Sequence, residues 1–366
     1  MTEATHGDFV CEGALGRRRV LEGSAGSLAG MTAQLEDAPE KGLDVSPWHL
    51  ADARTRQRRR RMLFVVVVAF TLFVALAGVP TGREWLTLWV LVTLLAAVGG
   101  DVLVWRRAVV RDWLPLLAVL FTYDLLRGVA NEVGGSLFDL HSWHSNPSNP
   151  ASAVRAHLDQ PVNADKWLFG GHVPTVWLQQ HLYDPGVAHW YDKVAVPVYL
   201  SHFLVSLILA ITLWCVNYPL FRRYLATLVT LTLVTLATYV VYPAAPPWMA
   251  ALNGHIPPVH RVVQATLSVL GGETVNTAVE KGAAYSNPVA AMPSLHAAIP
   301  MMLVLLFWTR ARWWVRAGLA VYALAMGLTL VYTGEHYVID VLVGWAYAAI
   351  SVVGVNRVSR ARAVAT

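Results

Sequence analysis

Residues 334–350 read Gly-Glu-His-Tyr-Val-Ile-Asp-Val-Leu-Val-Gly-Trp-Ala-Tyr-Ala-Ala-Ile. His336 and Asp340 lie four residues apart at the start of this apolar run, so on a helix they share one face. A buried carboxylate that accepts one ring N–H leaves the other ring nitrogen with its lone pair and stabilises positive charge on the ring. The stretch therefore predicts an apolar helix with a reactive imidazole at its start.

A second stretch, residues 290–298, reads Ala-Ala-Met-Pro-Ser-Leu-His-Ala-Ala and also opens an apolar run. It places another histidine, His296, at the start of that helix. A single histidine at the end of a membrane helix is commonly an interfacial residue, but ionisable groups inside apolar helices are costly and usually mark function. We expect His296, His336 and Asp340 to meet in space.

The composition is that of a membrane protein. Of 366 residues, 56% are hydrophobic and only 14% are charged, where soluble domains have about 25% charged residues. The 15 tryptophans and 13 tyrosines suit two aromatic belts at the membrane interfaces. The net charge is +5, but the basic residues cluster beside apolar runs, which favours membrane topology over nucleic-acid binding. The two cysteines, Cys11 and Cys215, have no metal-ligand or disulfide pattern.

The apolar runs predict an all-α fold, a polytopic membrane helical bundle of about eight transmembrane helices. A run must cover about 30 Å of hydrocarbon to span a bilayer. The runs that meet this length are Met62–Val79, Trp85–Val104, Trp113–Val129, Val194–Cys215, Tyr224–Val241, Val289–Trp308, Val315–Tyr332 and Tyr337–Val355.

Basic residues set the expected orientation. The run Arg54–Arg61 precedes the first span and predicts a retained cytoplasmic anchor rather than a cleaved signal or a nucleic-acid patch. Arginines recur at alternate ends of the later spans, so both termini are expected in the cytoplasm. Residues 1–55 are predicted to be a disordered cytoplasmic tail and residues 56–366 the membrane domain. Both histidine stretches then face away from the cytoplasm, as expected for a site on the outer face of a bacterial plasma membrane.

Two long outer connections, Ala130–Lys193 and Tyr242–Pro288, are too polar to span. The first is expected to carry short helices on the outer surface. The second begins Tyr242-Pro243-Ala244-Ala245-Pro246-Pro247-Trp248, where three prolines in five residues predict a stiff exit from a helix.

With these motifs in view, the chain resembles the type 2 phosphatidic acid phosphatase superfamily, in particular the branch typified by inositol phosphorylceramide synthase. The proline-rich turn, the Pro-Ser-Leu-His helix start and the His-Tyr-x-x-Asp-Val helix occur in that branch in this order, and they lie here at Tyr242–Trp248, Pro293–His296 and His336–Val341. The resemblance is good from about Tyr224 to Val355 and looser before it.

The resemblance implies a metal-independent enzyme without cofactor that acts on a lipid phosphate or phospholipid. His336 would attack phosphorus, oriented by Asp340, and form a phosphohistidine, while His296 would act as general acid and base. Ser294 and the start of its helix could hold phosphate oxygens. Pro300 could bend that helix, or serve only as a packing kink.

One motif of the wider superfamily is missing. The Lys-x6-Arg-Pro string that its phosphatases carry does not occur here, so another cation must hold the phosphate. The candidates on the outer side are Arg127, Lys166, Arg261 and Lys281.

The sequence is compatible with several functions. Transfer of a phospho-headgroup to a hydroxyl acceptor is favoured over hydrolysis of a lipid phosphate, because the turn at Tyr242–Trp248 and the Trp-rich outer loops favour a covered site. A transporter would place its ionisable groups nearer the bilayer midplane. A zinc site formed by His296, His336 and Asp340 is possible by ligand type. A receptor or scaffold leaves the His–Asp pair unexplained.

Overall fold

The computed structural model describes residues 53–77, 157–271 and 289–365, with short helical fragments between residues 88 and 118. Within these residues the chain is helical, with turns and isolated β-bridges between the helices. The predicted tail lies outside the described residues except for Ala53 to Thr55, which begin helix α2 (Ala53–Ala77). Most of the predicted spans Trp85–Val104 and Trp113–Val129 also lies outside them.

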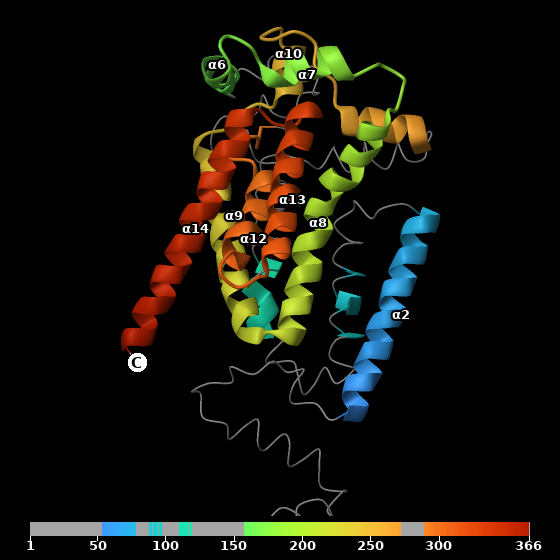
Figure 1. Cartoon of the computed structure of the whole chain (residues 1–366), viewed down its shortest axis with the longest axis vertical. Coiled ribbons are helices and arrows are strands. Elements are labelled where there is room, and N and C mark those ends of the chain that lie inside the picture. Colours follow the sequence, from blue (N-terminus) through green and yellow to red (C-terminus); the bar gives the residue numbers. More distant parts are fainter. Residues whose placement is uncertain are drawn as a thin grey trace, which may run out of the picture. The chain divides into compact units, whose positions relative to one another are not determined.

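Long helices run side by side beneath a layer of short ones (Figure 1). The long helices are α8 (Trp190–Val216), α9 (Tyr218–Val241), α12 (Leu295–Phe307), α13 (Trp313–Tyr332) and α14 (Val338–Ala365). The layer contains α6 (Asp159–Leu168), α7 (Pro174–Leu182) and α10 (Pro247–Leu252). The short helices expected in the first long connection are present as α6 and α7, and α10 lies in the second connection, where none was predicted.

The span count is supported in part. By length and composition, α9, α13 and Val338–Arg362 of α14 can each cross a membrane. Helix α8 makes a fourth span if its halves, Trp190–His202 and Leu204–Val216, which are bent by 46°, are taken together. The described residues thus support 3 or 4 of the predicted spans, and the count of eight is not confirmed.

The predicted span Val289–Trp308 is wrong at its start. Helix α12 begins only at Leu295, because Ser294 is its N-cap and its Oγ accepts a hydrogen bond from the Ala297 N–H at 3.3 Å. The residues before Ser294 form a bridge and turns. The 13 residues of α12 rise by only about 20 Å, less than the hydrocarbon thickness.

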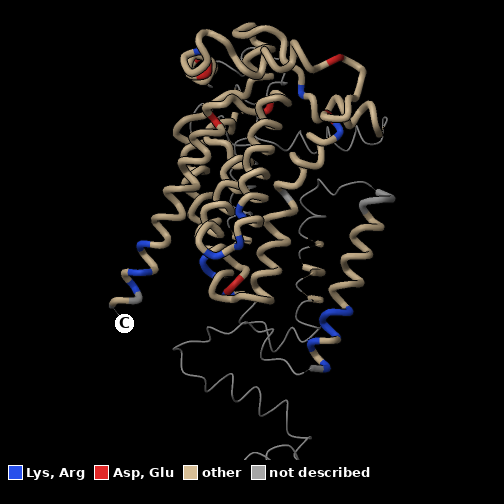
Figure 2. The backbone as a smooth tube through the Cα atoms, in the orientation of Figure 1, with Lys and Arg blue, Asp and Glu red and all other residues tan. Residues whose placement is uncertain are grey.

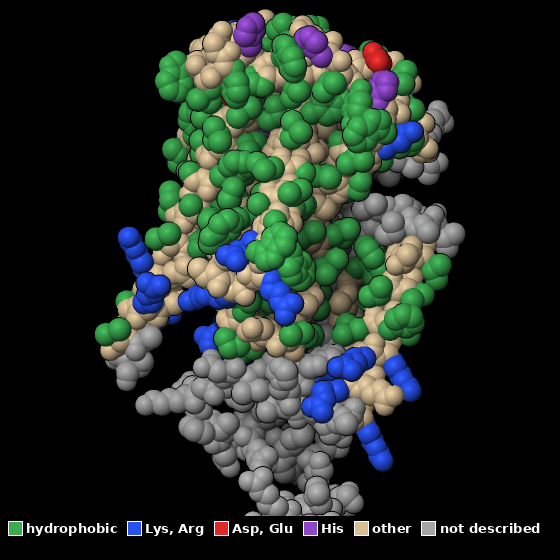
Figure 3. Space-filling model, in the orientation of Figure 1, with side chains coloured by type: hydrophobic (Ala, Val, Ile, Leu, Met, Phe, Trp, Pro, Cys, Tyr) green, Lys and Arg blue, Asp and Glu red, His purple; other side chains and the backbone are tan. Residues whose placement is uncertain are grey.

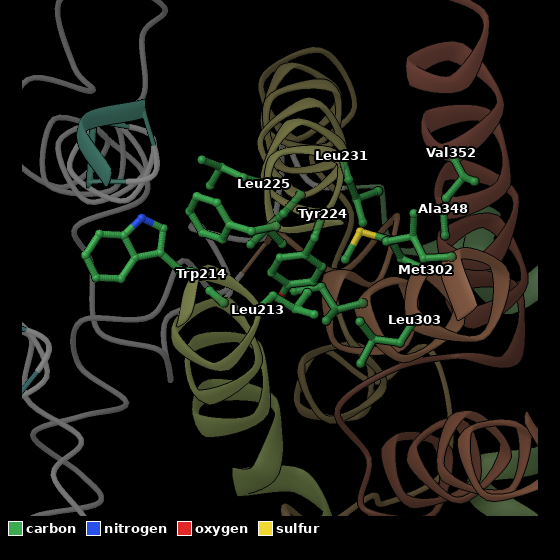
Figure 4. Close-up of a cluster of buried hydrophobic side chains, with 14 of the residues drawn as sticks. Leu213, Trp214, Tyr224, Leu225, Leu231, Met302, Leu303, Ala348 and Val352 are labelled. Atoms are coloured by element: carbon green, nitrogen blue, oxygen red, sulfur yellow. The ribbon is translucent and has the colours of Figure 1, made fainter. Parts of the chain in front are cut away.

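The largest buried cluster joins α8, α9, α12 and α14 (Figure 4). Tyr224 and Leu231 of α9 are fully buried between Leu213 of α8 and Met302 of α12. Between helices in a membrane such packing acts mainly through close van der Waals contact. This packing holds the helices together. The end of α9, the start of α12, the end of α13 and the start of α14 can then form a site.

Helix α14 lies unusually close to the start of α12. A Cβ atom added at Gly344 would lie 2.5 Å from the Ser294 carbonyl oxygen, so only glycine allows this approach. The Ser294 N–H also donates to the Asp340 carbonyl at 3.0 Å. The contact brings the two predicted histidine stretches together.

Charge divides the two ends of the bundle. Lysine and arginine gather at the end away from the short helices, at the start of α9, between α12 and α13 and at the end of α14 (Figure 2). Hydrophobic side chains cover much of the flank between the two ends (Figure 3). Exposed tryptophans occur in the short-helix layer and the start of α8 (Trp167, Trp177, Trp190) and around the α12–α13 turn (Trp308, Trp313, Trp314). This distribution fits two aromatic belts.

Candidate active site

The turn after α13 places His336. Gly334 has a φ of +79°, which L side chains rarely adopt, and a Cβ there would lie 2.7 Å from the His260 carbonyl oxygen. Glycine therefore lets the chain reverse against the segment around His260. His336 follows two residues later, two residues before the start of α14, and is only 6% exposed.

His336 and Asp340 are brought together as expected from their spacing. Nδ1 of His336 lies 3.4 Å from Oδ2 of Asp340, which is fully buried. Because a carboxylate only accepts, Nδ1 carries the proton in this bond and Nε2 keeps its lone pair. The same carboxylate oxygen accepts the Tyr337 N–H at 2.9 Å, which fixes the carboxylate across the first turn of α14.

His296 lies beside this pair. It is in the first turn of α12, and its ring centroid lies 5.9 Å from that of His336 with the planes inclined by 52°. Ser294, just before it, is completely buried as the N-cap of α12. The structure thus gathers His296, His336, Asp340 and Ser294 into one cluster.

Two side chains of α8 that the sequence analysis did not single out belong to the same cluster. The His202 ring lies 4.0 Å from the His296 ring, and the Tyr199 ring lies 5.0 Å from it and nearly parallel. A signal for His202 was available, since it is an ionisable residue inside the predicted span Val194–Cys215. Tyr199 carried no such signal, because aromatic residues are ordinary in membrane helices.

Asp165 of α6 was also missed as a site residue. Its carboxylate is fully buried and accepts the N–H groups of Val338 and Ile339 at 3.1 and 2.9 Å. These are the first residues of α14, so a side chain more than 170 residues upstream caps the helix that follows His336. Burial raises the pKa of the Asp165 carboxyl to about 6, despite the opposing effect of the two hydrogen bonds.

Of the four predicted phosphate-binding cations, Arg261 is joined by hydrogen bonds to the segment that carries His336. Its Nε and an Nη donate to the two carboxylate oxygens of Glu335 at 3.0 and 3.2 Å, and its guanidinium lies over the Trp248 ring. Glu335 directly precedes His336. Lys166 is in the last turn of α6, whereas Arg127 and Lys281 lie outside the described residues.

The proline-rich segment is more than a stiff exit from α9. Ala244 forms bridges with both His157 and Ala290. The Trp248 N–H donates to the Gly334 carbonyl at 3.3 Å, and the Tyr239 hydroxyl donates to the Pro293 carbonyl at 2.8 Å. The segment and the end of α9 therefore connect the start of α12 with the turn before His336.

Gln179 of α7, in the layer of short helices, holds the turn between α13 and His336. Its Nε2 donates to the carbonyls of His260 and Tyr332 at 2.9 and 2.8 Å, and its Oε1 accepts the His260 N–H at 2.8 Å. Gln179 is buried, so these bonds are made away from water. Gln179, in the layer of short helices, thus holds the end of α13 and the residue that precedes Arg261.

The described residues do not offer the ligand geometry that the alternative zinc centre would need. Among the residues that the structure describes, no three His, Cys, Asp or Glu side chains are placed so that they could hold one metal ion. That includes His296, His336 and Asp340.

Comparison with known proteins identifies the class. Residues 162–354 match the model of the PAP2 superfamily, and they include every described member of the cluster. This match covers more than half of the chain, so the protein belongs to the PAP2 superfamily. The resemblance drawn from the motifs is confirmed.

A relative points to one branch. Over 111 residues the chain is 34% identical to a phosphoinositol dihydroceramide synthase of Bacteroides thetaiotaomicron. The matched region is 29% of this chain and only 36% of that protein. No solved structure matches the chain.

Proposed function

We propose that the protein is a membrane enzyme that moves a phospho-headgroup from a lipid donor to a hydroxyl acceptor through a phosphohistidine on His336. The observation that carries this proposal is the His336–Asp340 contact, with the His296 ring 5.9 Å from the ring of His336. The contact occupies Nδ1 and leaves Nε2 as the nucleophile.

The reaction has two halves. In the first, Nε2 of His336 attacks phosphorus, the bond from phosphorus to the lipid oxygen breaks, and His296 gives its proton to the departing alkoxide. In the second, His296 takes the proton of the acceptor hydroxyl, whose oxygen attacks phosphorus while the P–N bond breaks. Asp340 stabilises the positive charge on the His336 ring in both halves.

Phosphate binding is assigned to Arg261 and to the start of α12. A helix N-terminus offers N–H donors and the positive end of the helix dipole, and Ser294 retains its hydroxyl proton as a donor. Glu335 holds two guanidinium nitrogens of Arg261, which leaves the remaining nitrogen for a phosphate oxygen. Lys166, Arg127 and Lys281 are the other candidates for this role.

Transfer is favoured over hydrolysis because the reacting groups are covered. His336 is 6% exposed and Asp340, in the first turn of α14, is fully buried. The bundle that contains α14 lies below the layer of α6, α7 and α10 (Figure 1). A closed site disfavours water as the acceptor. The name of the matched synthase supports a phosphoinositol donor and an acceptor of the ceramide type. We place the site on the extracytoplasmic face of the plasma membrane, since the basic ends of the helices lie opposite to it.

An acceptor experiment tests the proposal. Purified protein in detergent is given phosphatidylinositol labelled in the headgroup, with dihydroceramide or with no added acceptor. We expect a labelled lipid product that grows with dihydroceramide at the expense of free inositol phosphate, and no product from His336→Ala. Release of inositol phosphate alone, independent of added dihydroceramide, would assign the protein as a lipid phosphodiester hydrolase instead. Retention of full activity by His336→Ala would refute the phosphohistidine.

A further inference from the structure

The histidine on α8 has no part in the two-histidine mechanism described above, yet its ring lies closer to His296 than the ring of His336 does. The centroid separations from His296 are 4.0 Å to His202 and 5.9 Å to His336. The planes of His202 and His296 are inclined by 31°, so the rings meet largely through their faces. Tyr199, one helical turn before His202, makes a second ring contact with His296 at 5.0 Å and 17°.

We infer that His202 is a positioning residue for the general acid–base His296, and that it acts through the face of its ring. This inference rests on the function proposed above. It adds a third histidine, from α8, to a site otherwise built from α12 and the start of α14.

The χ2 torsion of histidine is broad, so its ring plane is set by neighbours rather than by a rotamer well. His296 must direct one ring nitrogen at the leaving oxygen, and a misplacement of about 1 Å can cost on the order of 100-fold in rate. Ring contacts from Tyr199 and His202 fix the plane and leave the nitrogens at the ring edge.

Charge also links His202 to the function proposed for His296. His296 carries a proton before it protonates the leaving alkoxide, and again after it deprotonates the acceptor. Two imidazolium rings at 4.0 Å would repel each other strongly in a buried site. Because His336 also gains positive charge during attack, the cluster tolerates a proton on His296 only while His202 is neutral. A neutral ring offers its π face to the protonated His296, which is a favourable contact.

The dependence of the burst rate on the leaving group distinguishes a positioning role of His202 from a general structural role. Phosphatidylinositol has an alkoxide leaving group that needs a proton, whereas the 4-nitrophenyl ester of inositol 1-phosphate has a leaving group that departs without one. The burst of leaving-group release reports the first half-reaction alone. The ratio of the two burst rates within one preparation is independent of how much protein is folded.

We expect His202→Ala to slow the burst with phosphatidylinositol about 10- to 100-fold, as loss of a supporting contact does elsewhere. The nitrophenyl ester should react within about threefold of wild type, because no proton from His296 is needed. His202→Phe keeps a ring face and should stay close to wild type with both substrates. Thr212→Val, an exposed change on the same helix, is the matched control.

Three results decide the matter. Equal losses on both substrates in His202→Ala, or no loss on either, would overturn the inference. A His202→Phe variant as slow as His202→Ala would overturn the ring-face role in favour of the ring nitrogens. His296→Ala is run alongside: if it lacks leaving-group dependence, the proposed function has failed, and if it shows that dependence while His202→Ala does not, only the present inference has failed.

Discussion

At the scale of single residues, the proposed chemistry depends on which ring nitrogen of His336 carries the proton. The Asp340 carboxylate takes Nδ1–H and is itself held by the Tyr337 N–H, so the tautomer with a lone pair on Nε2 is selected. An amide at position 340 could offer the ring a donor instead of an acceptor and so select the wrong tautomer. The proposed roles of His336 and Asp340 are therefore separable by substitution.

Substitution of His296, His336 and Asp340 tests their proposed roles. His336→Ala should remove turnover to below detection, and Asp340→Asn and His296→Ala should each lower kcat by about 10²- to 10⁴-fold. The acceptor assay measures these changes, and expression with retained solubility in detergent checks folding. His181→Ala is the control, because His181 is an exposed histidine on α7. Normal turnover by Asp340→Asn would contradict the orienting role of the carboxylate.

At the scale of helices, the site depends on how closely α14 approaches the start of α12. Gly344 permits this contact, and its position can be compared with Gly354 on the same helix, where an added Cβ meets nothing within 4 Å. The two glycines have similar helix propensities but different surroundings. They form a matched pair for testing the contact.

We expect Gly344→Ala to force α14 away from Ser294, with a loss of about 1–3 kcal/mol in stability and a fall of about 100-fold in kcat. Gly354→Ala should be neutral or slightly stabilising, by up to about 1 kcal/mol. Thermal unfolding in detergent and the acceptor assay measure both effects. If the two variants had the same stability and kcat, the close approach at Gly344 would not be needed for either property.

The contact between α6 and α14 gives a pH prediction. The pKa of the Asp165 carboxyl rises from 3.8 to about 6, chiefly because it is buried. Since the folded pKa lies above the unfolded one, the folded protein binds more protons between about pH 4 and pH 6. The contribution of Asp165 to the free energy of unfolding therefore falls as pH rises through this window, by on the order of 1–3 kcal/mol, and is constant above it.

Asp165→Asn removes this titration. The difference in unfolding temperature, wild type minus Asp165→Asn, should fall between pH 4.5 and pH 6.5 and level off at higher pH. The subtraction cancels the contributions of groups that titrate alike in both proteins. A difference that stayed constant, or grew with pH, would show that the Asp165 carboxyl does not titrate in this range.

At the scale of the whole molecule, the arrangement of charge predicts the sidedness of the site. The short-helix layer covers one end of the bundle and the arginines gather at the other (Figure 2). Arginine-rich ends remain on the cytoplasmic side. The His296–His336 cluster should therefore open to the opposite side.

Cysteine labelling tests this topology. In a background with Cys11 and Cys215 replaced by serine, Gln180→Cys on α7 should react with a membrane-impermeant maleimide in intact cells. Thr309→Cys between α12 and α13 should react only after the membrane is opened. Both positions are exposed, so access by the reagent is limited by the membrane alone. Labelling of Thr309→Cys but not Gln180→Cys in intact cells would invert the orientation.

The sequence by itself determined the features that are local. Apolar runs located α8, α9, α13 and α14 because membrane helices satisfy their own backbone groups within one segment. The four-residue spacing placed His336 on the same face as Asp340, because helix periodicity fixes that relation. The motifs around Tyr242, Ser294 and His336 were sufficient to predict the PAP2 superfamily.

Only the tertiary structure decided which distant residues complete the site. His202 reaches His296 from another helix, and Asp165 caps α14 from the outer layer. Neither contact has a periodic signature, because each depends on how separate helices pack. The late start of α12 likewise follows from its cap at Ser294 and the bridges around Ala290 rather than from hydropathy. Hydropathy reports how apolar a segment is, whereas the backbone hydrogen bonds decide where its helix begins.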